Sequence, residues 1–111
     1  MTVPIDPDTI AHVLSERGLD HADKDAAYRA LDDLTKTVLA ESMIDYAASE
    51  KSSAGREMRA LASRVYKDHL AALAAARRAA NRARVSFETY RAWVELKRTV
   101  AATDRALLNL R

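Results

Sequence analysis

A few histidines and carboxylates stand close enough in the sequence to suggest metal chemistry. His12 and Glu16 are four residues apart, which places both side chains on one face of a helix. Asp20, His21 and Asp23 form a second small group. A zinc site needs three or four ligands at a recognisable spacing, and neither group supplies the remaining ligands. We therefore expect surface side chains here and no metal.

Catalytic chemistry has little support in the rest of the chain. Glu41 and Asp45 form an acidic pair at helical spacing but lack the Glu-x-x-His pattern of a di-iron bundle. The chain has no cysteine, which excludes thiolate ligands, cysteine nucleophiles and disulfides. It has only two glycines, and neither a phosphate-binding loop nor a nucleophile elbow occurs. The expectation is a protein that is not an enzyme, with no catalytic residues and no cofactor.

Arginines dominate the charged side chains of the C-terminal half. Four of them lie within about two helical turns with no acid between them, and three further cations follow. Such a basic stripe has the chemistry to follow the phosphate backbone of DNA or RNA. The alternative is a solvated face, or pairing with acids of another subunit. The candidate nucleic-acid-binding residues are Arg77, Arg78, Arg82, Arg84, Arg91, Lys97 and Arg98.

The net charge of +2 hides two halves of opposite charge. Residues 1–55 carry eleven acidic and five basic side chains, a net charge of −6, whereas residues 56–111 carry five acidic and thirteen basic ones, a net charge of +8. Complementary charges set the register and orientation of paired helices, although each pair contributes little stability. The acidic half therefore either lies beside the basic half or leaves it free for a polyanion.

Composition predicts an all-α fold. The 111 residues include only two glycines and two prolines, too few for a turn-dense β-sandwich, and 23 alanines, the strongest helix former. This length suits a single domain, residues 1–111. Asp6 and Pro7 form a helix start, and Gly18 is expected to cap the end of this helix. A short helix is therefore predicted at about residues 7–17.

Two longer helices are expected to follow. Apolar side chains at helical spacing predict a second helix over about residues 22–50. Two serines able to cap and Gly55 predict a turn at about residues 51–55, which would fold the chain back as a long antiparallel helical hairpin. One continuous helix through this site is the alternative. Nothing in the sequence interrupts a third helix from about residue 56 to about residue 108.

The third predicted helix carries a coiled-coil repeat. Alternating steps of four and three residues connect a row of mostly small or aromatic side chains, which a partner helix can approach closely because its middle is alanine. We expect His69 to be hydrogen-bonded at an interface, Phe87 and Tyr90 to be core residues, and Trp93 to be a partner contact. The predicted seam consists of Ala62, Tyr66, His69, Leu73, Ala76, Ala80, Ala83, Phe87, Tyr90 and Val94, and continues to Lys97 and Ala101.

The second predicted helix is too short to cover the whole seam. We therefore expect another copy of the chain to cover the rest, in a dimer or a larger homo-oligomer of either orientation. The sequence shows neither a basic leader with an apolar segment nor a run of about 18 apolar residues. The expectation is a cytoplasmic protein with no membrane association.

The stretch from Leu31 to Thr99 resembles small uncharacterised helical proteins encoded in phages and prophages. The similarity is clearest in residues 31–35 (LDDLT) and residues 87–99 (FETYRAWVELKRT). Such proteins are often encoded near recombination or replication genes. The resemblance implies an accessory role close to DNA, and it carries over no functional residue.

The leading hypothesis is a non-enzymatic helical protein that self-associates and acts as an interaction or accessory factor. One alternative is a nonspecific nucleic-acid-binding protein that uses the basic stripe. The other is an inhibitor that binds a host protein. The salt dependence of DNA binding separates the first two hypotheses, because phosphate contacts weaken steeply with salt.

Overall fold

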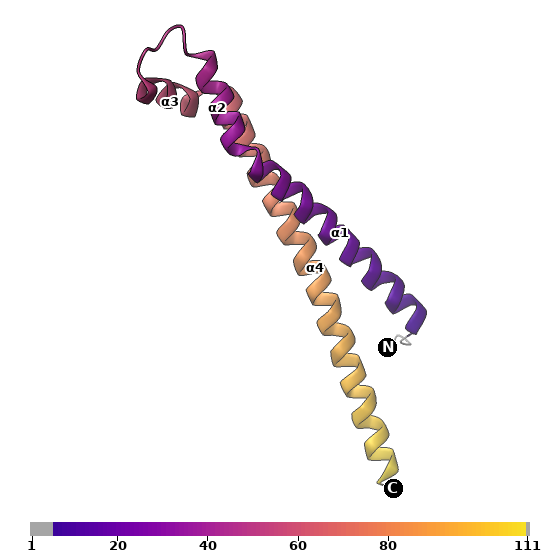
Figure 1. The fold of residues 1–111 in the computed structure, drawn as a ribbon. Coiled ribbons are helices and arrows are strands. Elements are labelled where there is room, and N and C mark those ends of the chain that lie inside the picture. Colours follow the sequence, from indigo (N-terminus) through magenta and orange to yellow (C-terminus); the bar gives the residue numbers. More distant parts are fainter. Residues whose placement is uncertain (1–5, 111) are drawn as a thin grey trace. The chain divides into compact units, whose positions relative to one another are not determined.

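The computed structural model describes residues 6–110, which are helical apart from short connections. That range contains no β-strand, so the predicted all-α fold class is confirmed. The helices are α1 (Pro7–Asp33), α2 (Thr35–Asp45), α3 (Ser53–Ala62) and α4 (Arg64–Asn109), as Figure 1 shows. No helix between residues 6 and 110 combines the length and the apolar composition that a membrane span requires.

The chain forms two compact units where the sequence predicts one domain. The terminal unit contains the start of α1, through Ala22, and the part of α4 that begins at Asn81. The central unit runs from Asp23 to Ala80 and contains the end of α1, all of α2 and α3, and the start of α4. Each unit has its own packing contacts between helices.

The predicted start of α1 at Asp6 and Pro7 is confirmed, because Pro7 is its first residue. The Asp6 carboxylate accepts hydrogen bonds from the Thr9 hydroxyl at 2.8 Å and from the backbone N–H of Asp8 at 3.2 Å. These two bonds, the Thr9 bond first, hold the pKa of Asp6 below its ordinary value because they favour the ionised carboxylate. The carboxylate thus satisfies donors that the helix leaves unpaired.

The predicted end of this helix at Gly18 is wrong. α1 continues through Gly18, and no glycine between residues 6 and 110 has a positive φ angle, so Gly18 forms no left-handed cap. A Cβ atom at this position would lie only 3.3 Å from Cε2 of Phe87, a residue of α4 in the same unit. Glycine in a helix interior costs about 1 kcal/mol relative to alanine. Here it permits the close approach of an aromatic ring.

The chain bends at Leu34, between α1 and α2. The Leu34 N–H is shared between the carbonyl oxygens of Ala30 at 3.3 Å and Leu31 at 3.2 Å. The Thr35 hydroxyl also donates to the Leu31 carbonyl, at 3.4 Å. A threonine hydroxyl that bonds the preceding turn often bends a helix. The single helix predicted over residues 22–50 is therefore wrong, because the second half of α1 and the separate helix α2 occupy this range.

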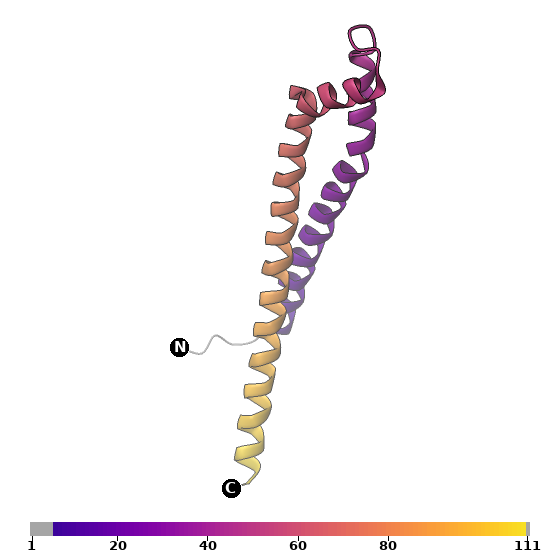
Figure 2. The same ribbon diagram turned by 90° about the vertical axis from the view of Figure 1, so that its left-hand side faces the viewer.

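The predicted turn at residues 51–55 begins earlier and is longer. Residues 46–52 connect α2 to α3, and Gly55 already lies in the first turn of α3. Ser52 caps this helix, because its hydroxyl accepts the backbone N–H of Gly55 at 3.0 Å. The predicted serine cap is therefore confirmed, and the alternative of one continuous helix is wrong. Figure 2 shows α3 leading across from α2 to the start of α4.

Two arginines hold α3 against the connection that precedes it. Arg56 donates through Nε to the Glu50 carbonyl at 2.7 Å and through Nη2 to the Ala47 carbonyl at 3.4 Å. Arg59 forms an ion pair with the Glu50 carboxylate at 2.8 Å, and its guanidinium lies 5.9 Å from the centre of the Tyr46 ring. These contacts satisfy backbone carbonyls that have lost their helical partners.

The long helix predicted over residues 56–108 is interrupted at Ser63, whose backbone is extended (φ −68°, ψ 150°). The Ser63 hydroxyl donates to the Ala60 carbonyl at 2.6 Å and accepts the backbone N–H of Tyr66 at 3.3 Å. One side chain thus ends α3 and begins α4, which then runs without a break. Ala62 belongs to α3 and is exposed, so its predicted place in a seam of the long helix is wrong.

Candidate interaction surface on the fourth helix

In the terminal unit, α1 packs against an aromatic part of α4. The Phe87 ring lies against Gly18, and its centroid is 6.4 Å from the centroid of the His21 ring. The Arg17 guanidinium lies 4.8 Å from the centre of the Tyr90 ring and donates to a backbone carbonyl of α4 at 3.4 Å. Phe87 and Tyr90 are therefore packing residues, as their place in the predicted seam suggests.

The most buried side chains of this unit are small or medium in size. Ala83 and Val94 of α4 are 6% and 2% exposed, and Ile10 of α1 is 6% exposed. An alanine buries far less area than a leucine and contributes correspondingly less hydrophobic stabilisation. Lys97, one turn further on, is half-buried and lies near the Trp93 ring.

In the central unit, a polar contact connects the start of α2 with α4. The Thr35 hydroxyl lies 2.9 Å from Nε2 of His69, so this histidine is hydrogen-bonded as expected. The predicted seam residues from Tyr66 to Val94 are all buried or half-buried in the single chain. A second copy on this face stays a prediction.

The last part of α4 carries a second, mainly apolar row, and within the described residues 6–110 all of its members except Trp93 are exposed. Every residue from 98 to 110 is exposed, and Leu96, Val100 and Leu107 expose 60%, 48% and 57% of their surface. The row follows alternating steps of three and four residues, and Leu96 stands more than half a helical turn beyond the buried Val94. We call this row the exposed stripe; it consists of Trp93, Leu96, Val100, Thr103, Leu107 and Leu110.

Trp93 connects the packed aromatic residues to the exposed stripe. Its ring stacks on the Tyr90 ring at a centroid distance of 5.6 Å, and Nζ of Lys97 lies 5.8 Å from the centre of the indole. The side chain is half-buried, so part of it remains open to a partner. Tryptophan is enriched at the centres of protein interfaces.

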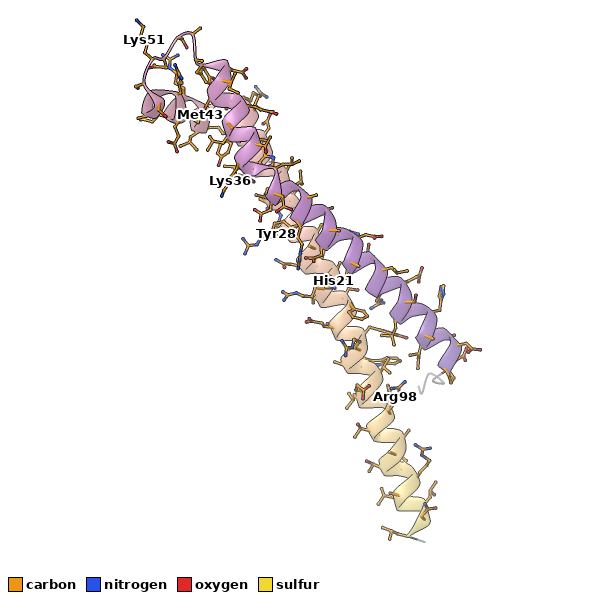
Figure 3. The ribbon with its side chains drawn as sticks, in the orientation of Figure 1. His21, Tyr28, Lys36, Met43, Lys51 and Arg98 are labelled. Carbon is orange, nitrogen blue, oxygen red and sulfur yellow. The ribbon has the colours of Figure 1, made fainter. Side chains whose placement is uncertain are left out.

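The side of α4 opposite the exposed stripe is polar. Arg98, labelled in Figure 3, forms an ion pair with Glu95 at 3.4 Å, and both side chains are mostly exposed. Alternating charges at this spacing are typical of a solvated helix face, and each exposed pair contributes at most about 1 kcal/mol. The segment is therefore amphipathic. Its charged side carries Arg84, Glu88, Arg91, Glu95, Arg98 and Arg105.

The predicted nucleic-acid-binding residues divide into two groups. Arg91, Lys97 and Arg98 contact Phe87, Trp93 and Glu95, respectively. The other four are exposed and form no ion pair with any residue in the range 6–110; they are Arg77 and Arg78 in the central unit and Arg82 and Arg84 in the terminal unit. This second group remains the candidate for binding a polyanion.

The side chains considered for metal chemistry do not gather into a site. His12 and Glu16 are 3.6 Å apart at the surface of α1, while His21 packs toward α4. Glu41 and Asp45 are exposed on α2. Within residues 6–110, no three histidine, aspartate or glutamate side chains lie close enough together to hold a metal ion.

The chain matches no protein-family model, no curated protein and no solved structure. The resemblance to phage-encoded helical proteins therefore stays a prediction. The exposed stripe is the feature that sequence reasoning missed. Its heptad spacing is visible in the sequence, but the longer repeat of the predicted seam runs alongside it on the same helix.

Proposed function

We propose that this protein is a non-enzymatic helical interaction factor that self-associates through the exposed stripe of α4. The supporting observation is that Leu96, Val100 and Leu107 are 48% to 60% exposed at coiled-coil spacing. They stand on or beside a segment whose residues 98–110 are all exposed. Contiguous exposed apolar surface marks interaction sites, and the charged opposite side suits a helix that is covered on one side only.

Burial of the stripe supplies the driving force for association. A fully buried leucine or valine side chain contributes about 1.5–3 kcal/mol, and both copies supply several such side chains. Association costs about 4–15 kcal/mol in lost translational and rotational freedom, and it also orders side chains. Because the surplus is small, we expect a dissociation constant on the order of micromolar.

We also infer that α1 and α4 pair as an antiparallel, coiled-coil-like hairpin. In the terminal unit Arg17 contacts Tyr90, and the later residue His21 contacts the earlier residue Phe87. Contacts that run in opposite sequence directions are those of antiparallel helices. The opposite net charges of the two halves of the chain favour the same arrangement.

Sedimentation over a range of concentrations tests self-association. Leu107→Asp places a carboxylate in the stripe, and we expect it to raise the dissociation constant at least about 30-fold, because burial of an unpaired charge is costly. Leu108→Asp is the matched control, since Leu108 is 64% exposed, compared with 57% for Leu107, but lies outside the stripe. Wild-type protein that remains monomeric at about 100 µM would contradict the proposal.

A second candidate function is nonspecific binding of DNA or RNA. Its support is the exposure of Arg77, Arg78, Arg82 and Arg84, none of which is ion-paired within residues 6–110. Like charges four residues apart, such as Arg78 and Arg82, slightly destabilise a helix. A phosphate backbone would relieve this repulsion and release counterions.

Electrophoretic mobility shifts at two salt concentrations test this second candidate with single- and double-stranded DNA. Glutamine at the four positions should weaken binding to every sequence and reduce the salt slope by about 0.9 for each lost phosphate contact. The same variant should leave the dissociation constant of self-association unchanged. An absence of binding at low salt excludes this function.

A further inference from the structure

The two edges of the exposed stripe differ in character. One edge carries the small side chains Ala92, Thr99 and Ala106, whereas the other carries Lys97 and Asp104, seven residues apart. Asp104 is exposed and forms no ion pair with any residue between 6 and 110. The stripe therefore has one uncharged edge and one edge with a positive and a negative charge.

We propose that a second copy of this chain covers the exposed stripe in the antiparallel orientation, with Lys97 of each copy facing Asp104 of the other. This inference rests on the proposed self-association and adds its orientation and register. The contact has twofold symmetry, so both copies contribute the same surface.

The difference between the edges selects the orientation. Two parallel helices bring the left edge of one helix to the right edge of the other, so the charged edge would face the uncharged edge. Two antiparallel helices bring like edges together. Lys97 then meets a carboxylate, while the small edges of the two copies meet and allow close approach of the helices.

The charge pair also sets the register. Pairing of Lys97 with Asp104 of the second copy places the twofold axis next to Val100, about midway between the two charged positions. In this register Trp93, Leu96, Leu107 and Leu110 face apolar side chains of the other copy, and Val100 faces the methyl-bearing side chain of Thr103. The resulting layers between copies are Trp93 with Leu110, Leu96 with Leu107, and Val100 with Thr103.

A second copy suits the stripe because the stripe is complementary to itself. The segment from Trp93 to Leu110 extends for about 27 Å and carries both the apolar layers and the two charges that its mate requires. A different protein would have to present the same layers together with opposite charges at the same separation. The self-complementary charge pair therefore favours the copy.

Disulfide trapping tests the orientation directly, because the chain has no cysteine of its own. Leu96→Cys and Leu107→Cys are made as separate variants and oxidised alone and as a mixture. In the antiparallel register, identical positions lie about 16 Å apart along the axis, too far for a disulfide. We expect the mixture to form a cross-linked dimer that contains one chain of each variant, and neither variant to cross-link alone.

Charge exchange tests the register with the full chain. Asp104→Lys alone places two like charges opposite each other, and we expect it to weaken self-association about three- to tenfold. The double variant Lys97→Asp with Asp104→Lys restores opposite charges and should return the dissociation constant to within about twofold of wild type. A double variant as weak as Asp104→Lys overturns the proposed pair.

The outcomes separate this inference from the proposed function. Self-association that Leu107→Asp abolishes, combined with cross-linking of Leu96→Cys to itself, overturns the antiparallel arrangement and leaves self-association through the stripe in place. Failure of the wild-type chain to self-associate overturns both. Cross-linking confined to the mixture, together with recovery in the charge-exchanged variant, supports the antiparallel dimer.

Discussion

Two consecutive parts of α4 have opposite environments. Between Ala83 and Lys97, side chains pack on α1, and Val94 is 2% exposed. From residue 98 to residue 110 every residue is exposed, including Leu107 and Leu108. The leucines of the last part are therefore exposed, while the smaller Ala83 and Val94 are buried. Burial along α4 depends on where α1 packs against it and not on the size or hydropathy of the side chain.

This contrast separates two uses of an amphipathic helix. In the covered part α1 approaches α4 closely, as the contact between Gly18 and Phe87 shows. The uncovered part keeps leucines at heptad spacing although nothing between residues 6 and 110 covers them. Large apolar residues in such a row suit an interface, because burial of each one contributes more hydrophobic free energy than burial of an alanine.

The largest expected effect is on the free energy of unfolding, when a charge replaces the buried Val94. Val94→Asp should lower the free energy of unfolding by about 3 kcal/mol or more, because it buries a carboxylate without a partner. Val100→Asp, measured at a concentration where the protein is monomeric, should change it by less than about 0.5 kcal/mol. Urea unfolding followed by circular dichroism compares the two variants. Equal destabilisation would remove the distinction between the two parts.

Hydrogen exchange provides a second measurement, without mutation. Backbone amides of residues 87–94 should exchange at least about tenfold more slowly than those of residues 101–108 in the monomer, because the covered part opens only when α1 separates from it. Mass spectrometry or NMR at low protein concentration measures both sets of rates. Raising the concentration should slow exchange in residues 101–108 if the stripe pairs. Similar rates at low concentration would contradict the contrast.

Removal of residues 98–111 tests whether the uncovered part supports the rest of the chain. We expect the free energy of unfolding to change by less than about 0.5 kcal/mol, because no residue from 98 to 110 is buried. Self-association should disappear in the same variant. A loss of more than about 1 kcal/mol would show that the segment stabilises the chain's own fold.

The smallest effect concerns the start of α1, which covers α4. Because the folded-state pKa of Asp6 is lowered, its ionised cap contributes stability above the unfolded pKa, and this contribution is lost as the pH falls through the folded pKa. Helix content of α1 should therefore decrease below about pH 4. Asp6→Asn keeps a capping side chain without a titratable group, so a difference between the two acid titrations measures the effect. Coincident titrations would contradict it.

Local features of the fold could be predicted because their causes lie within a few residues. Asp6 and Pro7 start a helix through bonds to residues at most four positions away, and Ser52 caps through the N–H of Gly55. The breaks at Leu34 and Ser63 could not be predicted with the same certainty. The residues at both breaks have ordinary helix propensities. The hydrogen bonds that interrupt the helix there compete with other backbone and side-chain partners nearby.

The continuation of α1 through Gly18 depended on a contact from far along the chain. A glycine after an amphipathic segment is usually a cap, but here Phe87 packs where a Cβ would lie. That contact is set by the approach of α4 and leaves no signal near Gly18. The same is true of the exposed stripe. The heptad spacing from Trp93 to Leu110 can be read from the sequence, but the exposure of these side chains cannot.

The sequence by itself determined that the chain is helical, that its halves carry opposite charge, and which residues share a face of α4. Composition and periodicity suffice for these properties, because they depend on backbone propensity and on the angle between successive side chains. The tertiary structure alone decided which apolar face is covered. Periodicity places residues on a common face, but the cover comes from α1, which continues through Gly18 and packs there against Phe87.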